Sequence, residues 1–427
     1  MSASSTPSRS SSRRRGDPRD ARHNGHAKRR KSPALKMVME MMAIPGISCE
    51  EGRIAEYVRK QLRGAGVPAE AIKMDRAHQK TPTTGDVGNL VLKLPGRGAP
   101  AVRRAPRRVL MAHLDTVPIC VGSRPVWKQG PGFAEGYVES ASPQTGLGAD
   151  DRAGAAVVLD TALATLRREE HPPLTFFWTV QEEIGIQGVR QASLGLLGRP
   201  RLAFNFDGGS PCKLTRGATG GYRLTIDVHG VAAHAGGAPE FGVSAIAIAS
   251  LAIAELQQNG WHGAIRKGRQ QGTSNVGTIE GGAATNVVTD HVRLRAEARS
   301  PDSKFRQRIV TQIEKAFARA AATTKNVAGQ SGRVSFEGGL DYESFYLEDD
   351  DPSLLAAEEA VRRVGGQPLR FFSNGGLDAN WMTPRGIPTV TLGCGQLYQH
   401  TTEERLDVAR FHEACQIARL LAWEAGT

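Results

Sequence analysis

Four apolar runs, each ending at or leading into an acidic residue or a histidine, constrain this chain more than any other feature of its sequence. The runs and their polar residues are 108–113 with His113, 174–180 with Glu182 and Glu183, 202–206 with Asp207, and 387–392 with His400. Near-continuous apolar runs are typical of parallel strands that are buried on both faces. In open α/β sheets, ligands gather beyond the carboxyl ends of the strands. We therefore predict an α/β fold whose mostly parallel sheet brings these side chains together at one edge.

A fifth acidic position, Asp150, lies outside this strand pattern. Residues 146–149 (Gly-Leu-Gly-Ala) precede it, and residues 153–166 have the apolar spacing of a helix. Asp150 and Asp151 therefore stand near a helix start, where an anionic side chain is stabilised. Asp150 can act there as a helix cap, as a ligand, or as both.

These residue types favour a site for divalent metal ions. Imidazole and carboxylate groups together suit zinc, cobalt or manganese. One zinc ion needs about three or four ligands, whereas two ions that share a bridging carboxylate need about five and a water. The chain supplies five candidates, which are His113, Asp150, Glu183, Asp207 and His400. Asp115 and Glu182 remain to orient ligands and to transfer protons. We therefore predict a hydrolase that binds two divalent ions, with Zn²⁺ as the first candidate and Co²⁺ or Mn²⁺ as alternatives.

Eight segments, in order along the chain, are similar to those of a known family. They are residues 111–118, 148–154, 180–185, 206–209, 230–236, 285–288, 375–380 and 400–404. Together they resemble the M20 metallopeptidases and, within that family, the tripeptide aminopeptidase (peptidase T-like) branch. The similarity extends from about Lys36 to the C-terminus. One segment alone would say little, but eight in the family's order make the resemblance specific.

The resemblance assigns a role to each residue of the predicted metal site. It implies that His113 and Asp207 bind one ion. Glu183 and His400 would bind the other ion, with Asp150 as the bridge between the two. Two ions that share a water lower its pKa towards neutrality and so provide a hydroxide nucleophile. In the family, the peptide bond after the bridging aspartate is often cis.

Two further residues would support the reaction. By the resemblance, Glu182 is the general base, which takes a proton from the attacking water and returns it to the leaving amine. Asp115 would accept a hydrogen bond from the other ring nitrogen of His113 and thereby fix the tautomer of the ring. The usual lysine after the two aspartates is Arg152 here, which keeps the positive charge.

A middle block, predicted at residues 216–348, contributes no candidate metal ligand. Its predicted strands are 222–228, 275–279, 292–298 and 333–336, and its predicted helices are 244–257 and 305–322. This β-α-β-β-α-β order is that of a ferredoxin-like α+β domain. The resemblance implies that it is a lid and dimerisation domain, inserted between two catalytic parts at residues 34–215 and 349–427.

The resemblance also places residues of the middle block over the metal ions. In a homodimer, His234 would reach into the partner subunit's active site and face the developing charge on the substrate's carbonyl oxygen. Asn286 and Arg299 would contact substrate, although an arginine at the end of a strand can equally form an ion pair. Asp378, in the second catalytic part, would support the substrate site through hydrogen bonds rather than as a metal ligand.

The first 33 residues differ from the rest of the chain. They hold ten Lys and Arg against two Asp, a net charge of +8 out of the chain's +12. A basic segment without apolar periodicity is expected to be disordered. It lacks the apolar stretch that a secretory signal contains. Its paired arginines could suggest a twin-arginine signal, but the residues that follow them resemble the first helix of an enzyme. We favour a solvated start over a nucleic-acid-binding arm, and we expect no nucleic-acid partner.

Several functions remain open at this point. No apolar run reaches transmembrane length, so we expect no membrane partner, and five scattered cysteines fit a reducing cytoplasm. In the family, aspartate at the position of Asp207 tends to accompany aminopeptidases and dipeptidases, which favours short peptides cleaved from the amino end. The alternatives are an amidohydrolase or deacylase of N-acyl amino acids and a catalytically idle, metal-stabilised binding protein. The presence of Glu182 beside all five ligands argues against the idle protein.

Overall fold

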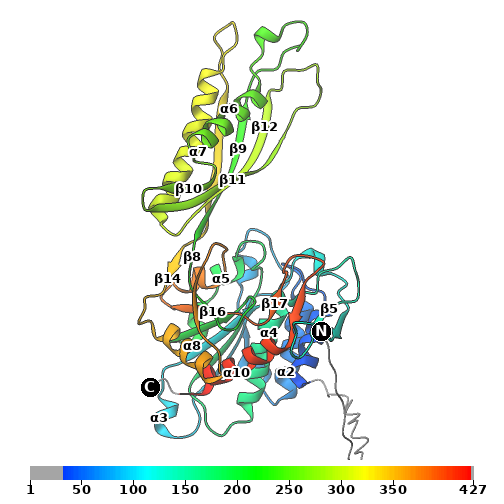
Figure 1. Ribbon diagram of the computed structural model, residues 1–427, viewed down its shortest axis with the longest axis vertical. Helices are drawn as coiled ribbons and strands as arrows, with labels where there is room; N and C mark the ends of the chain where they lie inside the picture. The colour runs from blue at the N-terminus through cyan, green and yellow to red at the C-terminus, as the bar shows by residue number, and fades with distance from the viewer. Residues whose placement is uncertain (1–31, 425–427) are drawn as a thin grey trace, which may run out of the picture. The chain divides into compact units, whose positions relative to one another are not determined.

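The computed structural model describes residues 32–424. The basic tail predicted at residues 1–33 therefore lies almost wholly outside the described residues. The chain divides into two units, Met1–Ser32 and Pro33–Thr427, and the fold below is that of the second unit (Figure 1).

A large sheet forms the centre of the catalytic part. Within residues 32–424 it has nine strands in the order β1-β2-β6-β3-β7-β16-β8-β14, with β15 also beside β8. Its strands are β1 (Ile72–Met74), β2 (Leu90–Leu94), β3 (Arg108–His113), β6 (Leu174–Thr179), β7 (Leu202–Phe206), β8 (Lys213–Ala218), β14 (Phe345–Tyr346), β15 (Leu369–Ser373) and β16 (Thr389–Leu392). The four central strands β6, β3, β7 and β16 are parallel. These are the four predicted runs, and the prediction of a mostly parallel sheet is confirmed.

The sheet is buried on both faces, which explains its continuous apolar strands. Along β3, Leu110 and Ala112 pack into one core, whereas Val109 and Met111 pack into another on the opposite face. The first core is shared with α1 (Pro33–Met42), α2 (Gly52–Gly64), α4 (Ala149–Leu166), α8 (Pro352–Arg363) and α10 (Val408–Trp423). The second core is shared with α5 (Gln187–Arg190) and α9 (Ala379–Met382).

A small antiparallel sheet lies within the same catalytic part. Its order is β17 (Gln396–Leu397), β18 (Arg405–Asp407), β5 (Tyr137–Ser140) and β4 (Pro125–Lys128). The sheet pairs Leu406 with Val138, so a late segment of the chain lies beside an early one. The loop between β17 and β18 carries His400.

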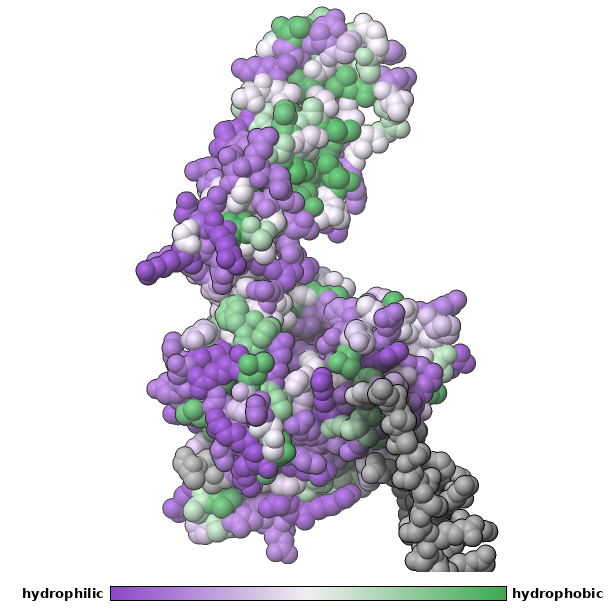
Figure 2. Space-filling view, viewed as in Figure 1, coloured by the Kyte–Doolittle hydropathy of each residue, from purple (hydrophilic) through white to green (hydrophobic). Residues whose placement is uncertain are grey.

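The inserted domain has its own sheet and core. Its five strands follow the order β10 (Gly263–Lys267), β11 (Gln270–Gly281), β12 (His291–Ser300), β9 (Gly220–His229) and β13 (Arg333–Tyr342), all antiparallel. The helices α6 (Ala245–Gln258) and α7 (Ser303–Thr323) pack against each other and share one core with the sheet. Outside that core, Ile246, Leu251 and Ile279 are exposed, and Figure 2 shows hydrophobic side chains on the surface of this domain.

The structure adds one strand, β10, to the predicted ferredoxin-like order. It forms a tight hairpin with β11, in which Lys267 pairs with Gln270 and Gly268 has a φ of +63°. Only Ile265 of this strand is buried, so β10 has little of the apolar alternation that predicts strands. Arg216, where the inserted domain was predicted to begin, lies in β8 of the large sheet, and the boundaries 216–348 stay a prediction.

Side-chain caps begin several of the helices. The carboxylates of Asp302, Asp351 and Asp407 accept backbone hydrogen bonds at the starts of α7, α8 and α10, and Ser244 caps α6. Each such cap stabilises a helix by about 1 kcal/mol. The remaining short elements are η1 (Ala69–Ala71), η2 (Ala77–Gln79), α3 (Pro100–Arg103), η3 (Pro118–Cys120), η4 (Leu194–Leu197) and η5 (Pro239–Phe241). None of the helices in residues 32–424 is long and apolar enough to cross a membrane.

Candidate metal centre

Asp150 lies between the two histidines of the predicted site. Its Oδ1 is 3.2 Å from Nε2 of His113, at the end of β3, and its Oδ2 is 3.5 Å from Nε2 of His400. The same nitrogen of His400 is 3.0 Å from Oε1 of Glu183. One carboxylate thus faces two imidazoles through different oxygens, which is the arrangement that a bridging ligand needs.

Asp207 approaches the cluster from β7. His113, Asp150 and Glu183 form one group whose candidate ligand atoms lie within 4.8 Å of one another, and His113, Asp151 and Asp207 form a second. The fold therefore brings His113, Asp150, Glu183, Asp207 and His400 into one cluster.

Asp151 belongs to the second group, although its sequence context indicated no role beyond the helix start. Its Oδ2 accepts a hydrogen bond from the backbone N–H of His113 (3.1 Å). Its Oδ1 accepts from the N–H of Gly154 (3.0 Å) and from Nε2 of Gln396 (2.7 Å). Because both oxygens are engaged with the protein, we assign Asp151 to holding the end of β3 in place. The peptide bond between Asp150 and Asp151 is cis, as the resemblance implied.

The pKa shifts in the cluster show that its buried carboxylates favour a nearby positive charge. Burial lowers the pKa of His113, but hydrogen bonds with Asp115 and Asp150 raise it well above the usual value. Hydrogen bonds with Asp150 and Glu183 raise the pKa of His400 to about 10. Burial and then repulsion from Asp150 raise the pKa of Asp207 to about 7. Buried carboxylates at such spacing need compensating positive charge, so this donor set fits divalent ions.

Asp115 joins the ends of two neighbouring strands. Its buried carboxylate accepts hydrogen bonds from the backbone N–H groups of Glu182 and Glu183, both at 3.0 Å, and from the Ser48 hydroxyl at 2.6 Å. Nδ1 of His113 lies 3.1 Å from the backbone oxygen of Asp115 and 3.4 Å from its Oδ1. The hydrogen bond of this ring nitrogen is with the carbonyl of Asp115, whereas the carboxylate, which was predicted to accept it, lies further away.

Glu182 stands directly before the candidate ligand Glu183, just beyond β6. Burial raises the pKa of the Glu182 carboxyl well above its usual value; His113 lowers it, and the neighbouring carboxylates of Glu183 and Asp207 raise it further. A carboxyl group with a raised pKa can exchange protons near neutral pH, as a general base must.

Asp378 lies near enough to the cluster to raise the pKa values of Glu182 and Asp207. Its Oδ2 accepts a hydrogen bond from the Thr179 hydroxyl at the end of β6 (2.5 Å), and burial raises its pKa to about 6. Asp378 is only 1% exposed, which fits a supporting role better than direct contact with substrate.

The three predicted residues of the inserted domain have other contacts in this chain. Nδ1 of the exposed His234 accepts hydrogen bonds from the backbone of Gly236 (3.2 Å) and Gly237 (2.9 Å). The backbone oxygen of Asn286 accepts from the N–H of Ala235 (2.9 Å), so Asn286 and His234 are neighbours. For the described residues, no recorded contact joins either one to the metal cluster.

Arg299 forms the ion pair that the sequence left open. Its guanidinium donates to both carboxylate oxygens of Glu297, at 3.0 and 2.9 Å, and Nη1 also donates to the backbone oxygen of Asn374 at 3.2 Å. A substrate carboxylate would have to compete with Glu297 for this guanidinium.

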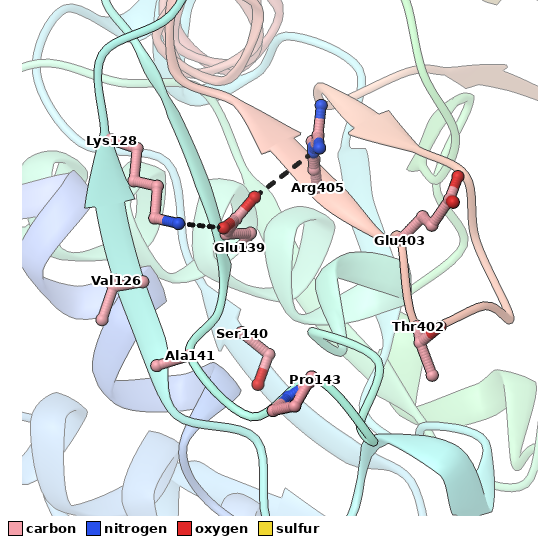
Figure 3. A pocket seen from close by; sticks show the side chains of 9 residues that line it. All are labelled: Val126, Lys128, Glu139, Ser140, Ala141, Pro143, Thr402, Glu403 and Arg405. Atoms are coloured by element: carbon pink, nitrogen blue, oxygen red, sulfur yellow. Dashed lines mark ion pairs between the residues drawn. The ribbon is translucent and has the colours of Figure 1, made fainter.

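A cavity of about 550 Å³ lies over the small sheet, and the predicted site residues do not line it (Figure 3). Its lining residues are Val126, Lys128, Glu139, Ser140, Ala141, Pro143, Thr402, Glu403 and Arg405. Oε1 of Glu139 is 2.5 Å from Nζ of Lys128, and Oε2 is 3.5 Å from Nε of Arg405. Because one carboxylate already engages both cations, the cavity offers no unpaired cation for an anionic ligand.

Sequence reasoning missed two buried glutamates near the cluster. Oε1 of Glu51 accepts from the backbone N–H groups of Cys49 (3.0 Å) and Gln181 (2.9 Å), and Gln181 directly precedes Glu182. Glu404 accepts from the loop that carries Asp150. Glu51 had no signal of its own, since a glutamate before a helix usually acts at the helix start. Glu404 did lie in a segment that matches the family.

The fold and this donor set define a metal-dependent hydrolase. Residues 216–325 match the family described as Peptidase dimerisation domain. The chain is 30% identical over 394 residues to Uncharacterized protein YqjE of Bacillus subtilis. The alignment covers 92% of this chain and 98% of that protein. It is 31% identical to a "Probable carboxypeptidase" of Paracoccidioides brasiliensis, over 64% of this chain and 62% of that protein.

Two solved structures are similar over nearly the whole length. A tripeptidase from Staphylococcus aureus matches with a TM-score of 0.79 and 28% sequence identity. The match covers 91% of this chain and 96% of the tripeptidase chain. Aminopeptidase PepT from Bacillus cereus matches with a TM-score of 0.77 and 29% sequence identity. The match covers 91% of this chain and 97% of the PepT chain. The chain belongs to the M20 family of metallopeptidases and is peptidase T-like, which makes it a metal-dependent peptide hydrolase.

Proposed function

We propose that this protein is a two-metal peptidase that removes amino-terminal residues from short peptides, tripeptides among them. The observation that carries the proposal is the position of Asp150, whose two oxygens lie 3.2 Å from His113 and 3.5 Å from His400. His113 and Asp207 would hold one ion, and Glu183 and His400 the other. Zinc is the first candidate for both positions, with cobalt or manganese as alternatives.

The residues of the chain divide the chemical work between them. Two ions held here would lower the pKa of a water and polarise the scissile carbonyl group. Glu182 would take the proton of the attacking water and return it to the leaving amine. Asp115 holds the backbone of both Glu182 and Glu183, so it keeps base and ligand in a fixed relation.

The choice of the amino end rests on two observations and has one against it. Position 207 is an aspartate, which in the family tends to accompany aminopeptidases and dipeptidases. The two similar structures are a tripeptidase and an aminopeptidase. The carboxypeptidase relative favours the opposite end, but its alignment covers only 62% of that protein. Deacylation of N-acyl amino acids is the third candidate.

A set of peptides with blocked ends separates these activities. We expect the metal-loaded protein to remove the first residue of a tripeptide with free ends and to act at a similar rate on its C-terminal amide. The N-acetylated tripeptide should react at least about 10²-fold more slowly, because a site built around a free ammonium group leaves polar groups unpaired without it. Mass spectrometry of the products identifies the released residue. Release of the last residue would support a carboxypeptidase, and cleavage of N-acetyl amino acids alone would support a deacylase.

We also propose a homodimer formed through the inserted domain. The match to the Peptidase dimerisation domain covers most of this domain, and its exposed hydrophobic residues provide apolar surface for a contact. The exposed large hydrophobic residues there are Phe241, Ile246, Leu251, Ile279, Val287 and Val327. A cytoplasmic location is proposed as well, in keeping with five free cysteines.

In this dimer, His234 would complete the partner subunit's site. We expect His234→Ala to bind two ions and to fold normally, yet to lose about 10²–10³-fold in turnover, because one oxyanion donor is removed. Mixing His234→Ala chains with Glu182→Ala chains should restore activity, since each hybrid dimer contains one site with both groups intact. The measurement is turnover before and after subunit exchange, with exchange monitored by a fluorescent label. Exchange without recovery would show that His234 does not act across the dimer.

A further inference from the structure

Glu404 connects the two loops that carry Asp150 and His400. The residue is 1% exposed, and its carboxylate points to the loop before α4. Oε2 accepts hydrogen bonds from the backbone N–H groups of Leu147 (2.8 Å) and Gly148 (2.6 Å). Oε1 accepts from the N–H of Asp150 itself (2.9 Å). One side chain therefore receives three backbone donors from a loop that is more than 250 positions away in the sequence.

The backbone around Glu404 is fitted to this contact. A Cβ atom on Gly146 would lie 3.0 Å from the backbone oxygen of Thr401 and 3.2 Å from Oε2 of Glu404. Gly148 has a φ of +79°, a left-handed conformation that suits glycine. The two glycines thus let the 401–404 segment approach closely and let the N–H groups converge on one carboxylate.

The other end of the same segment carries the ligand His400. Its Nε2 reaches Asp150 and Glu183, and four residues later Glu404 holds the backbone of Asp150. Beyond Glu404, β18 is fixed by its pairing with β5. The distance between the Asp150 and His400 side chains is consequently defined by one short, doubly anchored segment.

We propose that Glu404 is a positioning residue that sets Asp150 and His400 at the spacing required to bind the second metal ion. The proposal rests on the two-metal function proposed above. A carboxylate suits this position because it only accepts hydrogen bonds, and four donors meet there: three backbone N–H groups and the thiol of Cys120, whose Sγ is 3.6 Å from Oε2. Glutamine has the same size, but its amide NH₂ would confront one of the backbone N–H groups.

The test compares Glu404→Gln with Glu403→Gln. Glu403 is the neighbouring residue and is exposed, so the control makes the same chemical change outside the hydrogen-bonded cluster. Metal-free proteins are titrated with Co²⁺, and the visible absorption of the bound ion gives affinity and coordination. We expect Glu404→Gln to bind one of its two ions about 10–100-fold more weakly, with an altered cobalt spectrum, as for other residues that orient metal ligands. Glu403→Gln should match the wild type.

Each other outcome is informative. Wild-type affinity and spectrum in folded Glu404→Gln would overturn the proposal. If Glu404→Gln does not fold, the same titration is made with Glu404→Asp, which keeps the charge but shortens the reach and should also weaken one ion. If neither variant folds, Glu404 is a structural residue and the proposal is wrong. A wild-type protein that binds fewer than two ions would instead refute the proposed function, and the positioning role of Glu404, which rests on it, would fall with it.

Discussion

Replacing Glu182 by glutamine is expected to reduce turnover by about 10²–10⁴-fold while both metal ions stay bound, because a general base contributes about that much. The change keeps the size of the side chain and the backbone hydrogen bond from Glu182 to Asp115. It removes only the group that can take a proton from water. Turnover of a tripeptide and metal content after dialysis are the two measurements.

The next residue provides a matched control for this prediction. Glu183→Gln makes the same chemical change one position further on, in a carboxylate whose Oε1 lies 3.0 Å from His400. We expect Glu183→Gln to weaken the binding of one ion, in contrast to Glu182→Gln. If Glu182→Gln lost an ion and Glu183→Gln kept both, the two roles would be reversed.

Replacing Asp150 by alanine should abolish activity and weaken the binding of both ions. The reason is that the Asp150 carboxylate faces His113 with one oxygen and His400 with the other. The His400→Ala variant should lose only the ion that His400 and Glu183 hold. In the wild type, a free metal concentration of 100 times the Kd stabilises the fold by about 2.7 kcal/mol for each ion bound. Added metal should therefore raise the Tm.

Thermal unfolding with and without metal, together with metal content, checks this prediction. The Asp150→Ala variant should show little rise in Tm with metal, and His400→Ala an intermediate rise. An Asp150→Ala protein that still bound two ions with unchanged affinity would show that Asp150 is not the bridge.

The main sheet and the cluster of candidate ligands could be predicted from the sequence because both depend on local patterns. A parallel strand buried on two faces is apolar at nearly every position, as in β3, β6 and β7. The side chains just beyond such strands must meet at one sheet edge, so the strand pattern alone predicts that His113, Glu183 and Asp207 lie together. The individual roles that we propose for them come from the family resemblance.

The features that were missed depend on contacts between distant segments. Asp151 accepts a hydrogen bond from Gln396, and Glu404 accepts from Gly148, at separations of 245 and 256 residues. Nothing in the local spacing of these residues indicates such partners. Strand β10 was missed because it is short and mostly exposed, so its pattern is weak. For Arg299, the sequence allowed either an ion pair or a substrate contact; the structure shows the ion pair with Glu297, and the substrate contact stays a prediction.

Titration of the metal-free protein tests the central claim most directly. Zn²⁺, Co²⁺ or Mn²⁺ is added in steps, and the hydrolysis of a tripeptide is followed by mass spectrometry at each step. We predict that activity appears with metal, saturates at about two ions per chain, and releases the amino-terminal residue. Full activity at one ion per chain, or no peptide hydrolysis with two ions bound, would contradict the two-metal account.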